Sequence, residues 1–141
     1  MLERTIPKIS RNEEELKEQN KSLATRYYKR TPKDGLLSFS WPAQKIHDHI
    51  RALTCPYPGA FIIFKNKKLL IWKSSLGPDN PFPPGQICEI KRGKGILVTS
   101  GAKSIWLERV SYGDTEHWAD DWVLSHGLSL GDNLVDCQNF K

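Results

Sequence analysis

The sequence has no long hydrophobic run and few cysteines, and both absences narrow what the protein can be. No apolar stretch approaches the roughly 20 residues that a membrane-spanning helix needs. The opening segment MLERTIPKIS is charged and contains a proline, unlike the apolar centre of a signal peptide. Cys55, Cys88 and Cys137 are widely spaced and form no C-x-x-C pair. We therefore expect reduced thiols, no metal site, no membrane association and a cytoplasmic location.

Motifs of several common enzyme classes are also missing. The sequence has no G-x-G-x-x-G, G-x-x-x-x-G-K-[S/T], G-x-S-x-G or H-E-x-x-H motif. It therefore gives no local support for a phosphate loop, a serine hydrolase or a zinc protease. His47 and His49 are two positions apart in an expected helix, so they point about 200° apart and do not readily share a metal. Adjacent Asp120 and Asp121 do not face each other on a helix, and we interpret them as surface charges.

Positive charge is abundant in the middle of the chain. The 141 residues carry a net charge of +5, and the stretch from Phe61 to Leu107 is markedly basic, whereas the stretch after it is acidic. A basic segment can contact the phosphates of a nucleic acid or a nucleotide. It can equally be a solvated surface that keeps the domain soluble. Both interpretations remain open from composition. The basic residues of this stretch are Lys65, Lys67, Lys68, Lys73, Lys91, Arg92, Lys94 and Lys103.

The chain divides into residues 1–35 and residues 36–141. We interpret the first part as the remnant of a preceding domain followed by a linker, because it has few apolar residues and they are broken up by Pro7. Within it we expect a short helix capped by Asn12, a short strand over 24–28, and a turn-rich connector to Gly35.

A helix followed by a hairpin is the clearest local pattern of the second part. Apolar residues at Ala43, Ile46, Ile50 and Leu53 form one helical stripe, and we expect Ser40 to cap this helix. Two β-rich runs follow, 61–64 and 69–72, with a four-residue turn between them. The turn would present its lysines together to solvent. The candidate residues for phosphate contact are Lys65, Lys67, Lys68, Lys73, Lys91 and Arg92.

Further short strands predict the fold class. We expect strands over 86–91, 95–99 and 104–110, then a short helix over 116–124 that carries Trp118 and Trp122. Strands at this spacing with no helices between them indicate a small antiparallel barrel or sandwich. The prediction is a mainly β protein with short helices, organised as a small OB-like antiparallel barrel preceded by a helix.

One segment of the sequence resembles a known family. The stretch WPAQKIHDHIRALTCPYPGAF, residues 41–61, resembles the start of the C-terminal domain of 10-formyltetrahydrofolate-dependent formyltransferases. Weaker matches are RTPKDG in the preceding linker, KLLIW in a strand, and the closing GL-x-x-GD over 127–132. The resemblance covers about residues 24–135 and implies an OB-like domain. It also implies structural roles for Trp41, Arg51, Pro56, Pro58 and Gly59.

The resemblance also implies what this chain does not supply. In the family the catalytic groups are an Asn, a His in an H-x-S-L-L-P motif and an Asp, all in an N-terminal domain that also binds the folate. This sequence has no such motif, so we assign no catalytic residue and no cofactor to it. We expect the isolated chain to be inactive and its partner to be a formyltransferase catalytic domain, in cis or in trans. The chain is then either a fragment of a longer enzyme or a truncated relative.

Two branches of the family suggest different substrates. One formylates initiator methionyl-tRNA and the other formylates nucleotide-linked amino sugars. RTPKDG and the WKSS tract at 72–75 resemble the sugar branch more closely, whereas the lysines favour tRNA less decisively. We favour the nucleotide-linked amino sugar slightly. The alternative is a stand-alone OB-like module that binds RNA, another nucleic acid or a protein without catalysis.

Overall fold

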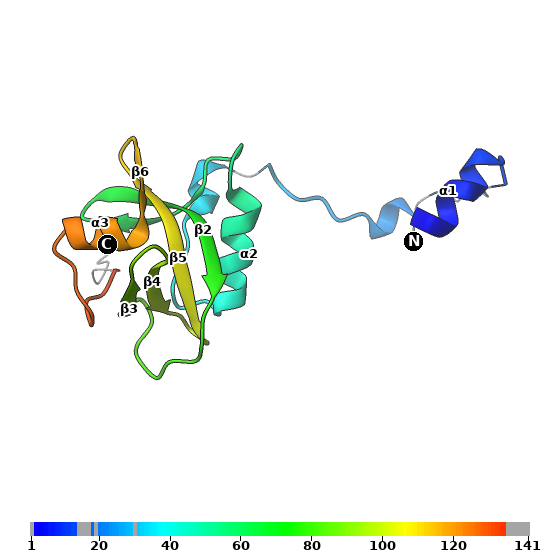
Figure 1. The fold of residues 1–141 in the computed structure, drawn as a ribbon. Helices are drawn as coiled ribbons and strands as arrows, with labels where there is room; N and C mark the ends of the chain where they lie inside the picture. The colour runs from blue at the N-terminus through cyan, green and yellow to red at the C-terminus, as the bar shows by residue number, and fades with distance from the viewer. Residues whose placement is uncertain (1, 14–17, 19, 30, 135–141) are drawn as a thin grey trace.

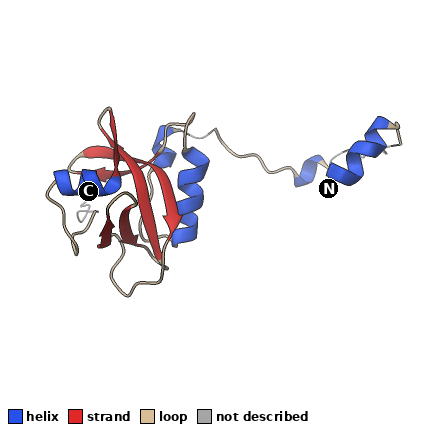
Figure 2. Cartoon of the chain, viewed as in Figure 1, coloured by secondary structure: helices blue, strands red, loops and turns tan. Residues whose placement is uncertain are grey.

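The computed structural model of the chain describes residues 2–13, 18, 20–29 and 31–134. Three α-helices, two 3₁₀ turns and six strands make up these residues (Figures 1 and 2). Their bounds are α1 Leu2–Ser10, 3₁₀ turns Lys21–Leu23 and Pro32–Gly35, α2 Ala43–Leu53, β1 Ala60–Phe64, β2 Lys67–Leu76, β3 Ile87–Lys91, β4 Gly95–Thr99, β5 Ser104–Tyr112, β6 Thr115–Trp118 and α3 Ala119–Ser125.

The strands form one antiparallel sheet in the order β1-β2-β5-β4-β3, with β6 paired to β5. Loops cover both outer strands. Leu37 donates its N–H to the carbonyl of Phe61 in β1 at 2.9 Å, and Ile87 in β3 donates to the carbonyl of Asp132, also at 2.9 Å. Covered edges prevent unwanted strand pairing. The mainly β fold with short helices is confirmed, and the curved six-stranded sheet is consistent with a small OB-like barrel.

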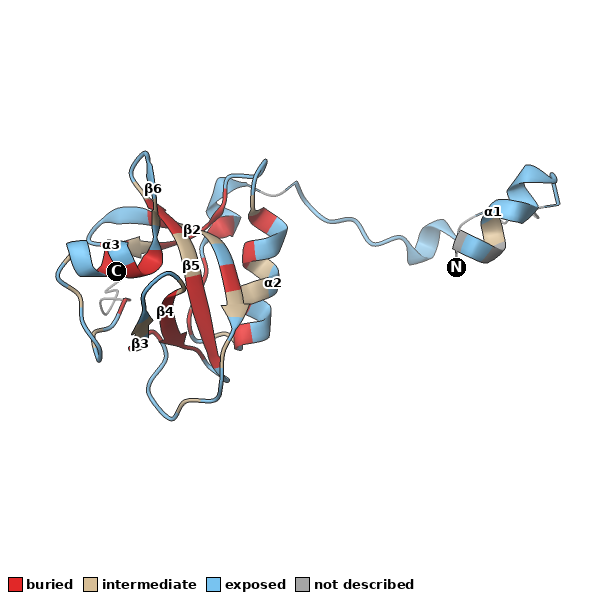
Figure 3. Cartoon of the chain, in the orientation of Figure 1, coloured by how far each residue is buried: buried red, intermediate tan, exposed pale blue. Residues whose placement is uncertain are grey.

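Helix α2 packs its predicted apolar stripe against the sheet. Ala43, Ile46, Ile50 and Leu53 are all buried, as the helical spacing predicted, and β2 is the strand that α2 contacts most (Figure 3). The expected cap at Ser40 is wrong. The helix begins after Pro42, which makes no side-chain capping bond. Proline favours a helix start because its ring fixes φ near the helical value.

The hairpin turn is shorter than predicted. Lys65 and Asn66 alone form it, with φ angles of +46° and +63°, and Phe64 pairs with Lys67. Two consecutive left-handed residues are the mark of a two-residue hairpin turn, whose twist matches that of the strands. Lys67 and Lys68 therefore belong to β2, and the expectation of a four-residue turn is wrong.

The region of the predicted 116–124 helix is divided between a strand and a helix. Residues up to Trp118 form β6 beside β5, and α3 begins at Ala119. Trp118 is consequently 39% exposed, whereas Trp122 is 1% exposed and packs edge-on against Phe64 in the core. The spacing had placed both indoles on one helix, but in the structure they belong to different elements.

The N-terminal segment extends away from the barrel (Figure 1). Helix α1 contains Pro7, and the 3₁₀ turn Lys21–Leu23 is followed by extended backbone with no strand pairing, so the strand expected over 24–28 is wrong. The short helix expected after Asn12 falls largely on residues 14–17, which lie outside the described residues. Within the described part of the chain, none of the helices has the length and apolar character to cross a membrane.

Candidate functional site

The hairpin lysines do not form one surface. Successive side chains of a strand point to opposite faces of the sheet. Lys67 lies over the ring of Tyr112, with 5.9 Å between Nζ and the ring centroid, whereas Lys68 lies over the ring of Phe61 at 4.4 Å. Lys65, in the turn, lies 5.3 Å from the centroid of Phe64. The candidate phosphate contacts on this hairpin are therefore split between two faces.

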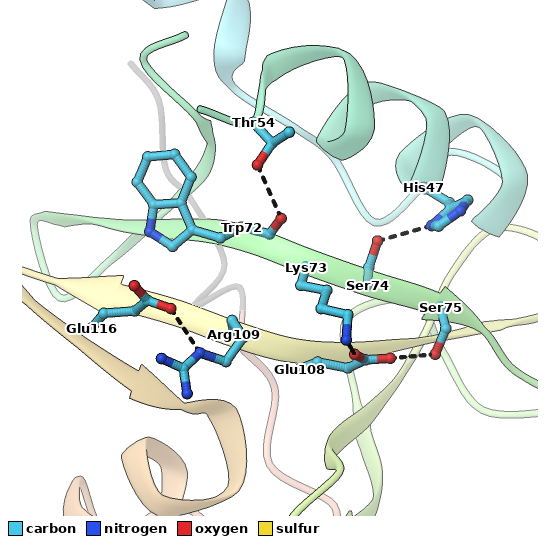
Figure 4. A network of polar contacts seen from close by, with 9 residues as sticks. All are labelled: His47, Thr54, Trp72, Lys73, Ser74, Ser75, Glu108, Arg109 and Glu116. Carbon is cyan, nitrogen blue, oxygen red and sulfur yellow. Dashed lines mark hydrogen bonds and ion pairs between the residues drawn. The ribbon is translucent and has the colours of Figure 1, made fainter. Parts of the chain in front are cut away.

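Lys73 belongs to a polar strip on β2 and β5 (Figure 4). Its ammonium lies 3.0 Å from Oε2 of Glu108, and the hydroxyl of Ser75 donates to Oε1 of the same carboxylate at 2.7 Å. Burial raises the pKa of Glu108, but the hydrogen bond from Ser75 and the charge of Lys73 outweigh it and leave that pKa below its usual value. Much of the positive charge of Lys73 is thus neutralised within the domain.

Lys91 ends β3, and Arg92 begins the turn between β3 and β4. This turn is fixed from α3, because the carboxylate of Asp120 accepts the backbone N–H of Gly93 at 3.0 Å. Asp120 is 1% exposed, so this predicted surface charge is in fact a buried structural group. The structure therefore distributes the candidate lysines and arginine over three places instead of gathering them into one site.

The Pro-Tyr-Pro-Gly corner turns the chain from α2 into β1. The Cys55–Pro56 peptide bond is cis, and Gly59 has a φ of +88°. A Cβ at Gly59 would lie 3.0 Å from side-chain atoms of Leu70 and Trp72, so a glycine is needed both for the backbone angle and for this close approach. The indole of Trp72 is held in place because Nε1 donates to the hydroxyl of Ser111 at 2.8 Å.

Two other residues of the motif lie on or beside α2. Arg51 donates to the Asp48 carboxylate at 2.9 Å, one turn earlier in its own helix, rather than to a group at the corner. Trp41 contacts the ring of His49 edge-on, with 5.4 Å between centroids, and Lys45 covers its other side at 4.1 Å. His47 is half-buried, and its Nδ1 lies 3.0 Å from the hydroxyl of Ser74.

A hollow that sequence reasoning missed lies beside the corner. It has a volume of about 490 Å³ and is bounded by the linker on one side and by the end of α2 and the corner on the other. The available signal was the cluster of basic and aromatic residues in the linker, which we interpreted only as a polar connector. The lining residues are Lys29, Thr31, Pro32, Ala52, Leu53, Tyr57 and Pro58.

The charge of the linker differs from that of the barrel. Residues 19–33 contain five Lys or Arg and no Asp or Glu, whereas residues 34–134 contain eleven Lys or Arg against ten Asp or Glu. Tyr27 and Tyr28, in the linker, are 90% and 98% exposed. The net positive charge thus comes to a large extent from the linker, and Lys29 of the linker lines the hollow.

Comparison with known sequences matches the formyl transferase C-terminal domain family over residues 29–126, which is more than half of the chain. The bifunctional polymyxin resistance protein ArnA of Wigglesworthia glossinidia brevipalpis is 38% identical over 112 residues, 79% of this chain and 17% of that protein. The methionyl-tRNA formyltransferase of Carboxydothermus hydrogenoformans is 36% identical over 87 residues, 62% of this chain and 28% of that protein. The chain thus spans less than a third of either relative.

Solved structures show the same fold at low sequence identity. A variant of HypX from Aquifex aeolicus superposes with a TM-score of 0.61 at 9% identity, over 99% of this chain and 25% of that one. HypX in complex with tetrahydrofolic acid gives a TM-score of 0.58 at 9% identity, over 86% and 22%. The sequence match includes α2, the Pro-Tyr-Pro-Gly corner and the whole strand order described above. The chain belongs to the family of formyl transferase C-terminal domains.

Proposed function

We propose that this domain positions the substrate of a formyltransferase, which transfers a formyl group from 10-formyltetrahydrofolate to an amine. The family match over residues 29–126 carries this proposal, because it includes both the linker end and the corner that the linker contacts. Gly35 and Gly59 are so close that a Cβ on Gly35 would lie 2.6 Å from the carbonyl oxygen of Gly59. This contact fixes the end of the linker against the corner.

The formyl donor and the catalytic groups are proposed to reside in a separate catalytic domain, in cis or in trans. A second hollow, of about 430 Å³, lies beside the linker. It is lined by a histidine and an aspartate, His49 and Asp34, and by Tyr27, Tyr28 and Lys29. Its lining includes no asparagine, so this hollow does not match the family's catalytic set. We assign the barrel a positioning role. We also propose that the protein is cytoplasmic, so its acceptor would be a molecule available in the cytoplasm.

A nucleotide-linked amino sugar is the acceptor that we favour. A tRNA-binding surface requires many unpaired cations facing the phosphate backbone. In the barrel, Lys73 is paired with Glu108, Arg109 with Glu116 at 2.7 Å, and the hairpin lysines are divided between two faces. This distribution of charge favours a small substrate with few phosphates rather than a long polyanion.

The test is reconstitution in trans. The 141-residue chain is added to the catalytic domain of a formyltransferase, and formyl transfer from 10-formyltetrahydrofolate is measured with two acceptors, a nucleotide-linked amino sugar and initiator methionyl-tRNA. We expect no turnover by the chain alone, and stimulation of the catalytic domain with the sugar acceptor. Stimulation with tRNA only would overturn the choice of acceptor. No stimulation with either acceptor, while the catalytic domain retains basal activity, would overturn the positioning role.

A further inference from the structure

We propose that the hollow between the linker and the Pro-Tyr-Pro-Gly corner binds the nucleotide part of the acceptor, with the base against Tyr57 and the phosphates near Lys29. This inference rests on the proposed function, because it specifies the substrate class of a formyltransferase acting on nucleotide-linked amines. The volume of about 490 Å³ lies within the range of pockets that bind small ligands.

The floor of the hollow suits a planar ring. Leu53 and Ala52 contribute apolar surface at the end of α2, and Tyr57 and Pro58 form the wall at the corner. Tyr57 is 60% exposed, so its ring is accessible to a ligand in the hollow. Bases stack on aromatic side chains regardless of their identity, so an exposed tyrosine above an apolar floor is a suitable base platform.

Each wall of the hollow is ordered by hydrogen bonds of its own. On the corner side, Tyr57 donates its N–H to the carbonyl of Thr54 at 3.1 Å, and Gly59 donates to that of Leu53 at 3.0 Å. On the linker side, the Asp34 carboxylate accepts the N–H of Thr31 at 2.6 Å and its hydroxyl at 3.0 Å. A site whose walls are already ordered loses less entropy when a ligand binds.

The charge of the linker side complements phosphate. Lys29 lines this hollow and also the neighbouring one of about 430 Å³ that contains Tyr27 and Tyr28. No ion pair of Lys29 is found within the described residues, and the nearby Asp34 accepts hydrogen bonds from Thr31. A lysine that has no carboxylate partner here retains its charge for an anionic ligand.

The experiment measures binding to the intact 141-residue chain, independently of formyl transfer. Uridine 5′-diphosphate and thymidine 5′-diphosphate are titrated into ¹⁵N-labelled protein, with uridine and inorganic pyrophosphate as partial probes. We expect amide shifts confined to the lining residues of the hollow. We expect Tyr57→Ala and Lys29→Ala each to weaken binding at least about fivefold, since each removes a separate contact. The matched controls are Phe82→Ala, another exposed aromatic residue, and Lys91→Ala, a lysine at the end of β3 that does not line the hollow.

Each other result contradicts the inference. The inference is overturned if neither nucleotide binds with a dissociation constant of about 1 mM or lower, the value that corresponds to a binding free energy of about −4 kcal/mol. It is also overturned if the control variants weaken binding as much as the hollow variants, or if the amide shifts map to the hairpin lysines. Tighter binding of a single-stranded oligonucleotide at the same amides would assign the hollow to nucleic acid instead. Tyr57 and Lys29 are exposed, so we expect both variants to fold. Unchanged amide shifts of the core residues will show that they do. Reconstituted formyl transfer without nucleotide binding would leave the proposed function standing and remove this site.

Discussion

The carboxylate of Asp120, in the first turn of α3, accepts the backbone N–H of Gly93 in the β3–β4 turn at 3.0 Å. This part-buried contact joins α3 to the β3–β4 turn. We expect Asp120→Ala to lower the free energy of unfolding by about 1–3 kcal/mol, because the hydrogen bond that joins these two elements is lost. Urea denaturation of the purified chain measures this change.

The neighbouring Asp121 is the matched control for Asp120. It lies in the same first turn of α3 and is exposed. We expect Asp121→Ala to change the free energy of unfolding by less than about 0.5 kcal/mol. Equal losses for the two substitutions would mean that the stabilisation comes from the helix dipole rather than from the bond to Gly93.

Gly59 is required for close packing as well as for its backbone angle. Gly59 and Gly113 have φ angles of +88° and +72°, so alanine is strained at both positions by a similar amount. Only at Gly59 would the new methyl group also meet Leu70 and Trp72, at 3.0 Å, since the space around Gly113 is open. We expect Gly59→Ala to destabilise by at least about 1 kcal/mol more than Gly113→Ala. Thermal unfolding of both variants tests this, and equal melting temperatures would contradict it.

The two-residue hairpin turn can be improved. Asn66 has a φ of +63°, which glycine adopts without strain and a β-branched residue does not. We expect Asn66→Gly to be neutral or to stabilise by up to about 0.5 kcal/mol, and Asn66→Val to destabilise by more than about 1 kcal/mol. Chemical denaturation measures both. A destabilising glycine together with a tolerated valine would contradict the turn geometry.

The Glu108 carboxylate makes stability depend on acid pH. Burial raises its pKa, but the bond from Ser75 and the charge of Lys73 bring that pKa below 4.5. A carboxyl group with a lower pKa in the folded state stabilises the fold above its unfolded pKa, and the contribution is lost as the pH falls through the folded pKa. We expect Glu108→Gln to remove this part of the pH dependence of unfolding, measured between about pH 6 and pH 3.

Ser75 tests the cause of the shift in Glu108. Without its hydroxyl, the carboxylate loses a hydrogen bond at 2.7 Å, and we expect Ser75→Ala to raise the pKa of Glu108. A ¹³C NMR titration of the carboxyl group measures this directly. Ser40→Ala, which changes an exposed serine bonded to Ser38, is the control and should leave the titration unchanged. A Glu108 pKa that does not respond to Ser75→Ala would assign the shift to Lys73 alone.

Much of the fold could be predicted because local patterns agree with it. The apolar stripe of α2 was evident from its helical spacing, because this helix buries one regular face. Strands β4 and β5 were evident from their short β-rich runs, and β4 is buried along its whole length. The division of 116–124 into β6 and α3 could not be predicted, because pairing of Thr115–Trp118 with β5 is a tertiary contact that overrides the helical spacing of Trp118 and Trp122. The hairpin register likewise depends on the left-handed angles of Lys65 and Asn66.

The candidate site was predicted less well than the fold. Counting lysines along the chain placed the basic surface on the hairpin, but strand alternation separates Lys67 from Lys68, and Glu108 neutralises Lys73. The hollow beside Tyr57 is built from the linker and the corner, which are more than twenty residues apart in the sequence. The close approach of Gly35 to Gly59 and the bond from Leu37 to Phe61 bring them together, and no local pattern indicates these contacts.

The most direct test of the positioning role is a domain exchange. In the Carboxydothermus methionyl-tRNA formyltransferase, the region matching this chain is replaced by residues 29–126, and formyl transfer is measured with initiator methionyl-tRNA and with a nucleotide-linked amino sugar. We predict that the exchanged enzyme keeps its folate-dependent chemistry, loses kcat/KM for tRNA and gains turnover of the sugar acceptor. An exchanged enzyme with the tRNA kinetics of its parent and no turnover of the sugar would contradict the account.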